Sequence, residues 1–139
     1  MSENFLGKVA VKIFILNESS NLLVVRQNEL EDYEVPGGRI DLGESIEDTI
    51  KRELFEELNI EIKNFNYKIE TNFQAMNPNE GVQHFYLIVS IKLGDEYIKK
   101  MSTSNEVAEM VWVDSGNYRN YKYKKFLERD VEKFVKNIK

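Results

Sequence analysis

The stretch from Gly37 to Ile60, GGRIDLGESIEDTIKRELFEELNI, constrains this chain more than any other. Apolar residues recur in it every fourth position, at Ile46, Ile50, Leu54 and Leu58, and this spacing predicts an amphipathic helix over residues 46–58. Ser45 followed by Asp48 resembles a capping box at the helix start. Asn59 suits a left-handed cap at the helix end. A helix with one apolar stripe must pack against a second layer, so the chain needs at least two layers.

Three carboxylates, Glu53, Glu56 and Glu57, share one side of this predicted helix, because at 100° per residue they project within about 100° of one another. Glu57 falls at the edge of the apolar stripe. If the acids are partly buried at about 6 Å from one another, each ionised pair costs roughly 3 kcal/mol at an effective dielectric near 20. Either a divalent cation or raised pKa values relieves that repulsion. Oxygen ligands favour Mg²⁺ or Mn²⁺.

Composition narrows the chemistry further. The chain has no cysteine and one histidine, His84, which excludes a disulfide scaffold, a thiolate zinc site and a cysteine nucleophile. Its net charge of −5 argues against a basic nucleic-acid-binding surface. No apolar run is long enough for a membrane span, and the acidic N-terminus does not resemble a signal peptide. We therefore expect a cytoplasmic protein without specific nucleic-acid or membrane binding.

The rest of the chain predicts strands before and after the acidic helix, and a second helix at the end. Strands are expected at 8–16 and 22–26 (a hairpin), briefly at 33–35, within 61–75, at 84–93 and at 108–114; 77–81 is a turn, 94–105 a loop and 122–137 an amphipathic helix. This order predicts an α/β fold with a mixed sheet and a helix on each face. No repeat or linker interrupts it, so we expect one domain over 1–139.

The full stretch reads G-x5-E-x7-R-E-U-x-E-E-x-N-U, where U is aliphatic. It resembles the box of the Nudix (MutT-related) hydrolases, and it departs from that box only at Asn59, where the family has glycine. The preceding segment from Glu34 to Gly37 resembles the family's E-x-P-G entry. The resemblance covers most of the chain and implies the Nudix αβα sandwich, with a mixed β-sheet between helices.

The resemblance also implies a function. It implies Mg²⁺-dependent cleavage of the pyrophosphate bond in a nucleoside diphosphate linked to a group X, with Mn²⁺ as another usable metal. The short chain favours a (deoxy)nucleoside triphosphate, as in MutT-type pyrophosphatases. By position, the implied metal ligands are Glu53 and Glu57, then Glu56 and the Gly38 carbonyl, while Glu44 and Arg52 support the site through a salt bridge.

Outside the box, Glu106 and Glu109 belong to an E-x-x-E-x-x-W-V segment, at the entry to the last strand, that resembles the segment of many family members. Glu106 is the better candidate for a further catalytic acid, as general base or ligand, and Glu57 is its rival for the role of base. Arg26 is either a ligand of substrate phosphate or a surface ion pair. We interpret His84 as a buried, hydrogen-bonded residue, and the three aromatics Phe73, Tyr86 and Trp112 as core. The lysines 122, 124 and 125 indicate a solvated helix face.

Three other functions compete. One is hydrolysis of ADP-ribose or a nucleotide sugar, for which Pro78 is too loose a signal. Another is a Nudix-fold sensor that binds a nucleotide without turnover. The third, a family-related isomerase, relies on a cysteine in its best-known case, and this chain has none. The sequence fixes neither the nucleobase, nor X, nor the oligomeric state, which includes a homodimer.

Overall fold

A computed structural model describes residues 7–77 and 79–137 of the chain. Residues 1–6 and 138–139 lie outside the described residues, and so does Pro78. The elements are β1 (Lys8–Leu16), β2 (Leu22–Arg26), β3 (Gly37–Arg39), α1 (Ile46–Leu58), β4 (Lys68–Asn77), β5 (Val82–Lys92), α2 (Asp95–Ile98), β6 (Glu109–Val113), a 3-10 turn (Tyr118–Asn120) and α3 (Lys125–Asn137). None of the helices in these two ranges has the length and apolar character needed to cross a bilayer.

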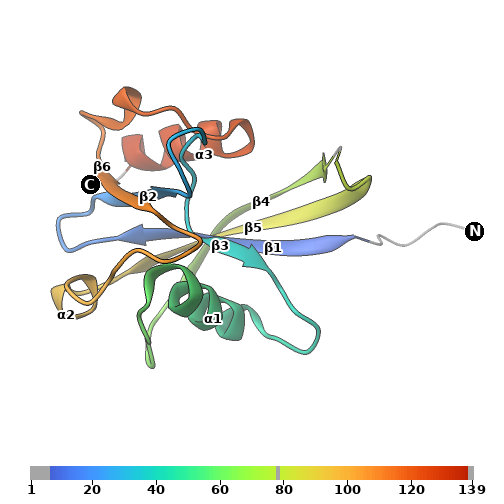
Figure 1. Ribbon diagram of the computed structural model, residues 1–139, viewed down its shortest axis with the longest axis horizontal. Helices are drawn as coiled ribbons and strands as arrows, with labels where there is room; N and C mark the ends of the chain where they lie inside the picture. The colour runs from blue at the N-terminus through green and yellow to red at the C-terminus, as the bar shows by residue number, and fades with distance from the viewer. Residues whose placement is uncertain (1–6, 78, 138–139) are drawn as a thin grey trace, which may run out of the picture.

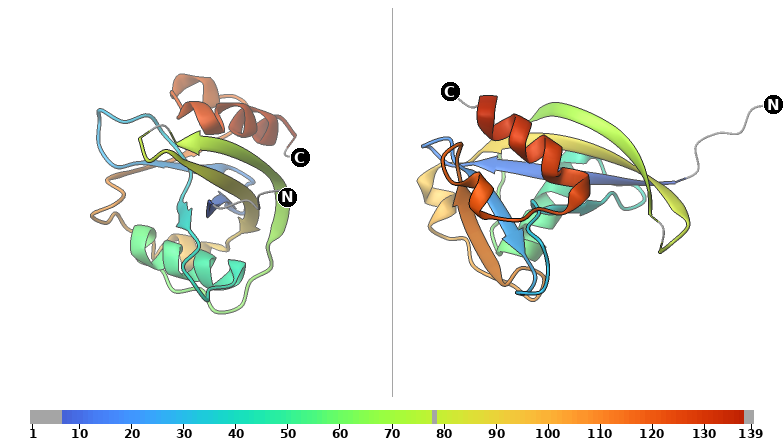
Figure 2. Two further views of the ribbon diagram at one scale, coloured as in Figure 1. Left: turned by 90° about the vertical axis from the view of Figure 1, so that its right-hand side faces the viewer. Right: turned by 90° about the horizontal axis from the view of Figure 1, so that it is seen from above.

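The sheet is mixed, and helices cover both of its faces. Its strand order is β4-β5-β1-β2-β6, and β3 pairs with β1 beside that path. β1 runs parallel to β5 and antiparallel to β2 and β3. Figure 1 shows α1 on one side of the sheet and α3 on the other, and Figure 2 shows the same layers from two further directions. The predicted α/β sandwich is confirmed.

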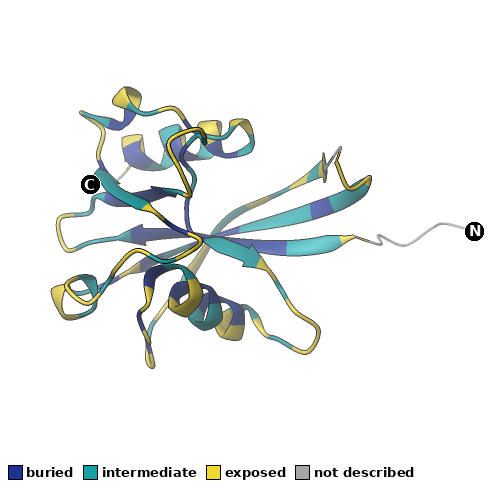
Figure 3. Cartoon of the chain, in the orientation of Figure 1, coloured by how far each residue is buried: buried dark blue, intermediate teal, exposed yellow. Residues whose placement is uncertain are grey.

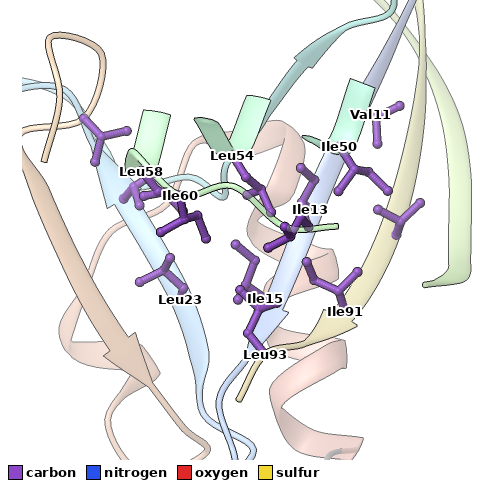
Figure 4. Close-up of a cluster of buried hydrophobic side chains, with 14 residues drawn as sticks. Val11, Ile13, Ile15, Leu23, Ile50, Leu54, Leu58, Ile60, Ile91 and Leu93 are labelled. Carbon is purple, nitrogen blue, oxygen red and sulfur yellow. The ribbon is translucent and has the colours of Figure 1, made fainter. Parts of the chain in front are cut away.

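Alternation along β1 feeds two separate cores. Val11, Ile13 and Ile15 point towards α1, where they pack with its apolar stripe, and Figure 4 shows this cluster. Phe14 points the other way and packs with residues of α3. Lys12 shares the α3 side with Phe14, because successive side chains alternate. Burial follows the same layers, with exposed loops around them (Figure 3).

β1 and β2 diverge after their hairpin, and this fork builds the site. Their only registered pair is Leu16 with Leu22. Further along, the segment before β3 lies between them. Glu34 exchanges backbone hydrogen bonds with Val25 of β2, at 2.7 and 2.8 Å, and the Ile13 N–H donates to the Pro36 carbonyl at 2.8 Å. Groups from the two faces of the sheet can therefore meet in the fork.

Helix α1 has the predicted bounds and caps. The Ser45 hydroxyl accepts from the Asp48 N–H, and the Asp48 carboxylate accepts from the Ser45 N–H. Asn59 adopts the left-handed conformation, at φ 58° and ψ 31°.

Several other boundaries were predicted wrongly. Gly37–Arg39 forms a strand that was not among those expected, because it pairs with β1. Residues 61–67 are not a strand, since their apolar side chains, such as Ile62, pack against the α1 core from a loop. The expected loop 94–105 holds the short helix α2. Helix α3 begins at Lys125, because the residues before it bond to the segment around Tyr33 instead.

Candidate active site

Arg52 on α1 organises one end of the acidic helix. Its guanidinium donates two hydrogen bonds to the Glu44 carboxylate, at 2.7 and 2.9 Å, as the sequence predicted. It also donates to the Glu53 carboxylate at 2.8 Å and to the Arg39 carbonyl at 2.8 Å. The Arg52 guanidinium and the Asp41 N–H hold the pKa of Glu44 at about 2, against an ordinary value of 4.5. This network fixes where Glu53 lies.

Glu53 is buried against β3, with 6% of its surface exposed. A methyl group at Gly38 would lie 2.2 Å from its Oε1 atom, so the glycine leaves the space that the carboxylate fills. Burial raises the pKa of Glu53; Arg52 opposes that rise, and Glu56 and Glu106 add to it. A cation bound next to Glu53 would therefore favour its charged form.

The structure brings Glu53 together with Glu56 and with Glu106 from the loop before β6. One carboxylate oxygen from each lies within 4.8 Å of the other two. Oxygens bound to one octahedral Mg²⁺ are about 3.0 Å apart when adjacent and about 4.2 Å apart when opposite, since each Mg–O bond is about 2.1 Å. Glu56, which also pairs with Arg52 at 3.4 Å, and Glu106 are exposed, so their side chains can move inward to these distances. The three acids thus fit a magnesium ion, and an all-oxygen donor set matches the metal's preference.

Glu57 lies apart from these three acids and faces the fork of the sheet. Its Oε2 atom accepts from the Gly37 N–H at 2.8 Å. Burial raises the pKa of Glu57 to about 8, despite the Lys12 ammonium and the Gly37 N–H, which act in the opposite direction. Its place at the edge of the apolar stripe was predicted from the helical spacing. Its separation from the group of Glu53, Glu56 and Glu106 was not.

A cavity of about 380 Å³ opens in the fork, and Glu57 and Glu106 both line it. Two cations line it as well, Arg26 from the end of β2 and Lys124 from the residue before α3. A larger depression of about 500 Å³ surrounds Phe55 on the outer side of α1, but none of the predicted ligands lines it. The smaller cavity is therefore the candidate substrate cleft.

Arg26 is held by Glu109, its partner in the β2–β6 register. The Arg26 guanidinium donates to Glu109 through Nε and pairs with it through Nη2, both at 2.7 Å. The Tyr33 hydroxyl donates to the other Glu109 oxygen at 2.6 Å, and the Tyr33 ring lies 4.6 Å from the guanidinium carbon. Of the two acids in the E-x-x-E segment, Glu106 joins the acidic group, and Glu109, the first residue of β6, pairs with Arg26 instead.

The prediction that Lys124 lies on a solvated helix face is wrong, because Lys124 pairs with Glu34 beside the cavity. Its ammonium lies 2.5 Å from Glu34, whose other oxygen accepts from the buried Lys12 at 2.8 Å. Burial acts to raise the pKa of Glu34, but Lys12 and Lys124 outweigh burial and hold that pKa below its ordinary value. Sequence reasoning missed this group. The one available signal was Lys12 itself, a lysine inside an apolar strand.

The weaker candidates lie away from the acids. His84 is buried, and its Nδ1 atom has no hydrogen-bond partner within the described ranges, so the expectation of a hydrogen-bonded ring is wrong for that atom. The ring stacks on Tyr86, 5.7 Å between centroids, and an aromatic neighbour offers Nδ1 no acceptor or donor. Tyr86 also packs on Phe73 and Phe126, which places it in the aromatic layer under α3.

Comparison with known proteins gives matches in one family. A model of the NUDIX domain matches residues 7–133. A Haemophilus influenzae 8-oxo-dGTP diphosphatase is 30% identical over 72% of this chain and 71% of its own length. A candidate 8-oxo-dGTP diphosphatase of Bacillus subtilis is 42% identical, but the match spans 32% of this chain and only 30% of that protein.

Solved structures share the fold at low sequence identity. One comes from work on MutT of Aliivibrio salmonicida and Vibrio cholerae, with a TM-score of 0.74, 18% identity, and coverage of 94% of this chain and 98% of that one. The E. coli dihydroneopterin triphosphate pyrophosphohydrolase also has a TM-score of 0.74, with 13% identity, and coverage of 97% of this chain and 100% of that one. Because the family model spans nearly all the described residues and the box residues run from Gly38 in β3 through α1 to its C-cap, the chain belongs to the Nudix family of MutT-related hydrolases.

Proposed function

We propose that this protein is a Mg²⁺-dependent pyrophosphohydrolase that cleaves a (deoxy)nucleoside triphosphate to the monophosphate and pyrophosphate. The observation that carries the proposal is the convergence of Glu53, Glu56 and Glu106 within 4.8 Å, beside a cavity lined by two cations. The Haemophilus influenzae relative named 8-oxo-dGTP diphosphatase supports a triphosphate substrate and makes 8-oxo-dGTP one to test.

In this proposal the site residues have separate tasks. Glu53, Glu56 and Glu106, whose carboxylates converge, are the candidate ligands of one metal ion, and Glu57 and the Gly38 carbonyl are further ligands that the family resemblance implies. The metal, when bound, neutralises phosphate charge and lowers the cost of forming hydroxide. Arg52 and Glu44 keep Glu53 in place, because a bidentate guanidinium–carboxylate pair fixes both position and orientation.

Two acids compete for the role of general base, the group that takes the proton of the attacking water. Glu106 and Glu57 both line the cleft, so each is within reach of a bound phosphate. Glu57 is oriented by the Gly37 N–H, whereas Glu106 is exposed on a loop. Arg26 is the proposed contact for substrate phosphate: Glu109 engages its Nε and Nη2 atoms, and a guanidinium carries five N–H donors in all.

The test is a panel of four deoxynucleoside triphosphates, 8-oxo-dGTP, ADP-ribose and a nucleotide sugar, assayed with Mg²⁺, with Mn²⁺ and with chelator. Chromatography identifies the products. We expect monophosphate and pyrophosphate from at least one triphosphate, with activity lost in chelator. Cleavage of ADP-ribose or the nucleotide sugar alone would favour the nucleotide-sugar alternative. Tight nucleotide binding with no turnover of any compound would favour a sensor.

Substitutions then separate the roles. Glu57→Gln should reduce kcat by several orders of magnitude while the fold stays intact, because glutamine keeps the shape but not the charge. Glu106→Gln tests the rival base by its pH–rate profile. Glu61→Gln is the matched control, since Glu61 is exposed just beyond α1. If Glu57→Gln stayed within a few-fold of wild type, the assignment of Glu57 to the metal or the base would be wrong.

A further inference from the structure

Lys124 is fixed in the cleft by the backbone on both sides. Its N–H donates to the Tyr33 carbonyl at 2.9 Å, and the Tyr33 N–H donates to the Lys122 carbonyl at 2.8 Å. Its own carbonyl accepts from the Leu127 and Glu128 N–H groups, which begin α3. The entry to α3 is thus tied to the segment beside the fork. The backbone that carries the Lys124 side chain is therefore held in place beside the cleft.

The charge of Lys124 is only partly compensated inside the protein. Glu34 is its close partner at 2.5 Å, but Glu34 is shared with Lys12, whose side chain is 8% exposed. Its other acid, Glu31, is 3.9 Å away with a side chain 38% exposed. An ion pair that long and that exposed is weak. Two ammonium groups therefore share Glu34, although Lys12 also interacts with Glu57, and one of the two, Lys124, lines the cavity.

The other cation that lines the cavity, Arg26, is less available to an incoming anion. Glu109 already occupies two of the Arg26 nitrogens. Besides the proposed metal, it is the cations of the protein that can offset the charge that a polyphosphate brings next to Glu106. Of the two cations that line the cavity, Lys124 is the easier one for an anion to reach. Its contact with Glu31 is long and open to solvent, so an anion can displace Glu31.

We propose that Lys124 is a substrate-binding residue that contacts a phosphate oxygen of the nucleotide, displacing Glu31 and keeping Glu34. Lys12 is a positioning residue in this arrangement, because it holds Glu34 from behind. The inference rests on the proposed function, since it places a phosphate in the same cleft. It adds a cation from the C-terminal segment, outside the box, to the substrate site.

The experiment compares Lys124→Ala, Lys124→Arg and Glu31→Gln with a control, Lys125→Ala, at the exposed first residue of α3. KM and kcat are measured for four deoxynucleoside triphosphates with Mg²⁺. Calorimetry measures the Kd of inorganic tripolyphosphate, which carries no nucleoside. Lys124→Ala should raise KM about tenfold or more, equally for all four bases, because a hydrogen bond to a charged group is lost. The Kd for tripolyphosphate should rise by a similar factor, with kcat within about threefold.

The other variants test the charge of Lys124 and the displacement of Glu31. Lys124→Arg should restore KM to within about threefold, Glu31→Gln should tighten tripolyphosphate binding, and Lys125→Ala should match wild type. An unchanged KM and Kd in Lys124→Ala would overturn the proposal. So would a base-dependent change in KM with normal tripolyphosphate binding, which would place Lys124 at the nucleobase.

Failure of the proposed function remains distinguishable. If the wild type cleaves no nucleotide, tripolyphosphate affinity still tests Lys124 alone. If Lys124→Ala does not fold, by circular dichroism, Glu31→Gln still decides the matter, because an unchanged Kd in that variant contradicts displacement of Glu31.

Discussion

Gly38→Ala tests whether the absence of a side chain at one position of β3 determines where the key carboxylate lies. The added Cβ atom would stand 2.2 Å from Oε1 of Glu53, 2.7 Å from its Cδ and 2.9 Å from its Oε2. Ordinary contacts begin near 3.4 Å. The carboxylate must therefore withdraw by about 1.2 Å, the difference between 3.4 and 2.2 Å. That shift also breaks the 2.8 Å hydrogen bond from Arg52 to the same oxygen.

The expected loss is larger in activity than in stability. A misplacement of about 1 Å in a catalytic group costs roughly 100-fold in rate. Overpacking a buried position costs about 1–3 kcal/mol. We therefore expect kcat/KM to fall about 100-fold, and a higher Mg²⁺ concentration to be needed for half-maximal rate. Chemical denaturation should show a protein that is still folded at the assay temperature.

Two glycine substitutions bracket this experiment. Gly94→Ala places its Cβ no closer than 3.5 Å to any atom outside its immediate neighbours, so activity and stability should both stay near wild type. Gly37→Ala meets the Val11 carbonyl oxygen at 2.1 Å, at a φ of 142°, so it should damage the fold itself. The reasoning fails if Gly38→Ala keeps its rate within about threefold and its Mg²⁺ dependence unchanged.

Two further predictions concern the support of the site. Arg52→Lys keeps the charge but loses the fork that binds Glu44 and Glu53 together, so kcat should fall about 10- to 100-fold, as for other residues that orient metal ligands; a rate within twofold of wild type would show that charge alone suffices. The pKa of Glu44 is lowered to about 2, so Glu44 stabilises the fold above its ordinary value of 4.5 and loses that effect as pH falls towards 2. The Tm difference between wild type and Glu44→Gln should therefore narrow from pH 6 to pH 2, and a constant difference would contradict the assignment.

The parts that sequence predicted well are those set by local signals. The bounds of α1 follow from its four-residue apolar repeat and from its caps. Ser45 and Asp48 act within the first turn, and Asn59 ends the last turn. The pair of Glu44 and Arg52 is only eight residues apart, and the resemblance to the family box implied it. In both cases the residues involved are close in sequence, so α1 itself brings them near one another.

Contacts between distant segments could not be predicted in the same way. Glu34 and Lys124 are 90 residues apart, and only the packing of α3 against the sheet brings them together. Arg26 meets Glu109 because β2 pairs with β6 in one register, which no local pattern specifies. The strand β3 was hidden for a related reason. Its two glycines weaken strand propensity, yet they are needed where β3 approaches β1 and Glu53 closely.

Asn59, where the chain departs from the family box, acts both in a local helix cap and in a contact with a distant segment. Asn59 caps α1 in the left-handed conformation, as glycine would, but its side-chain amide also donates to the Ser102 hydroxyl at 2.9 Å and the Thr103 carbonyl at 2.7 Å. Those residues lead into the loop that carries Glu106. Asparagine therefore ties the end of α1, with its acids, to that loop.

Asn59→Gly should separate the two effects. Glycine adopts the left-handed cap without strain, which offsets the loss of two exposed hydrogen bonds of about 0.5–1.5 kcal/mol each, so Tm should change little. The loop should open more often, raising amide hydrogen exchange at Glu106 and Val107 and lowering kcat a few-fold. Asn59→Ala loses the loop contacts and strains the cap, at about 1–2 kcal/mol, so its Tm should fall as well. Wild-type exchange and kcat in Asn59→Gly would mean that Asn59 is only a helix cap and that Glu106 is held by its own loop.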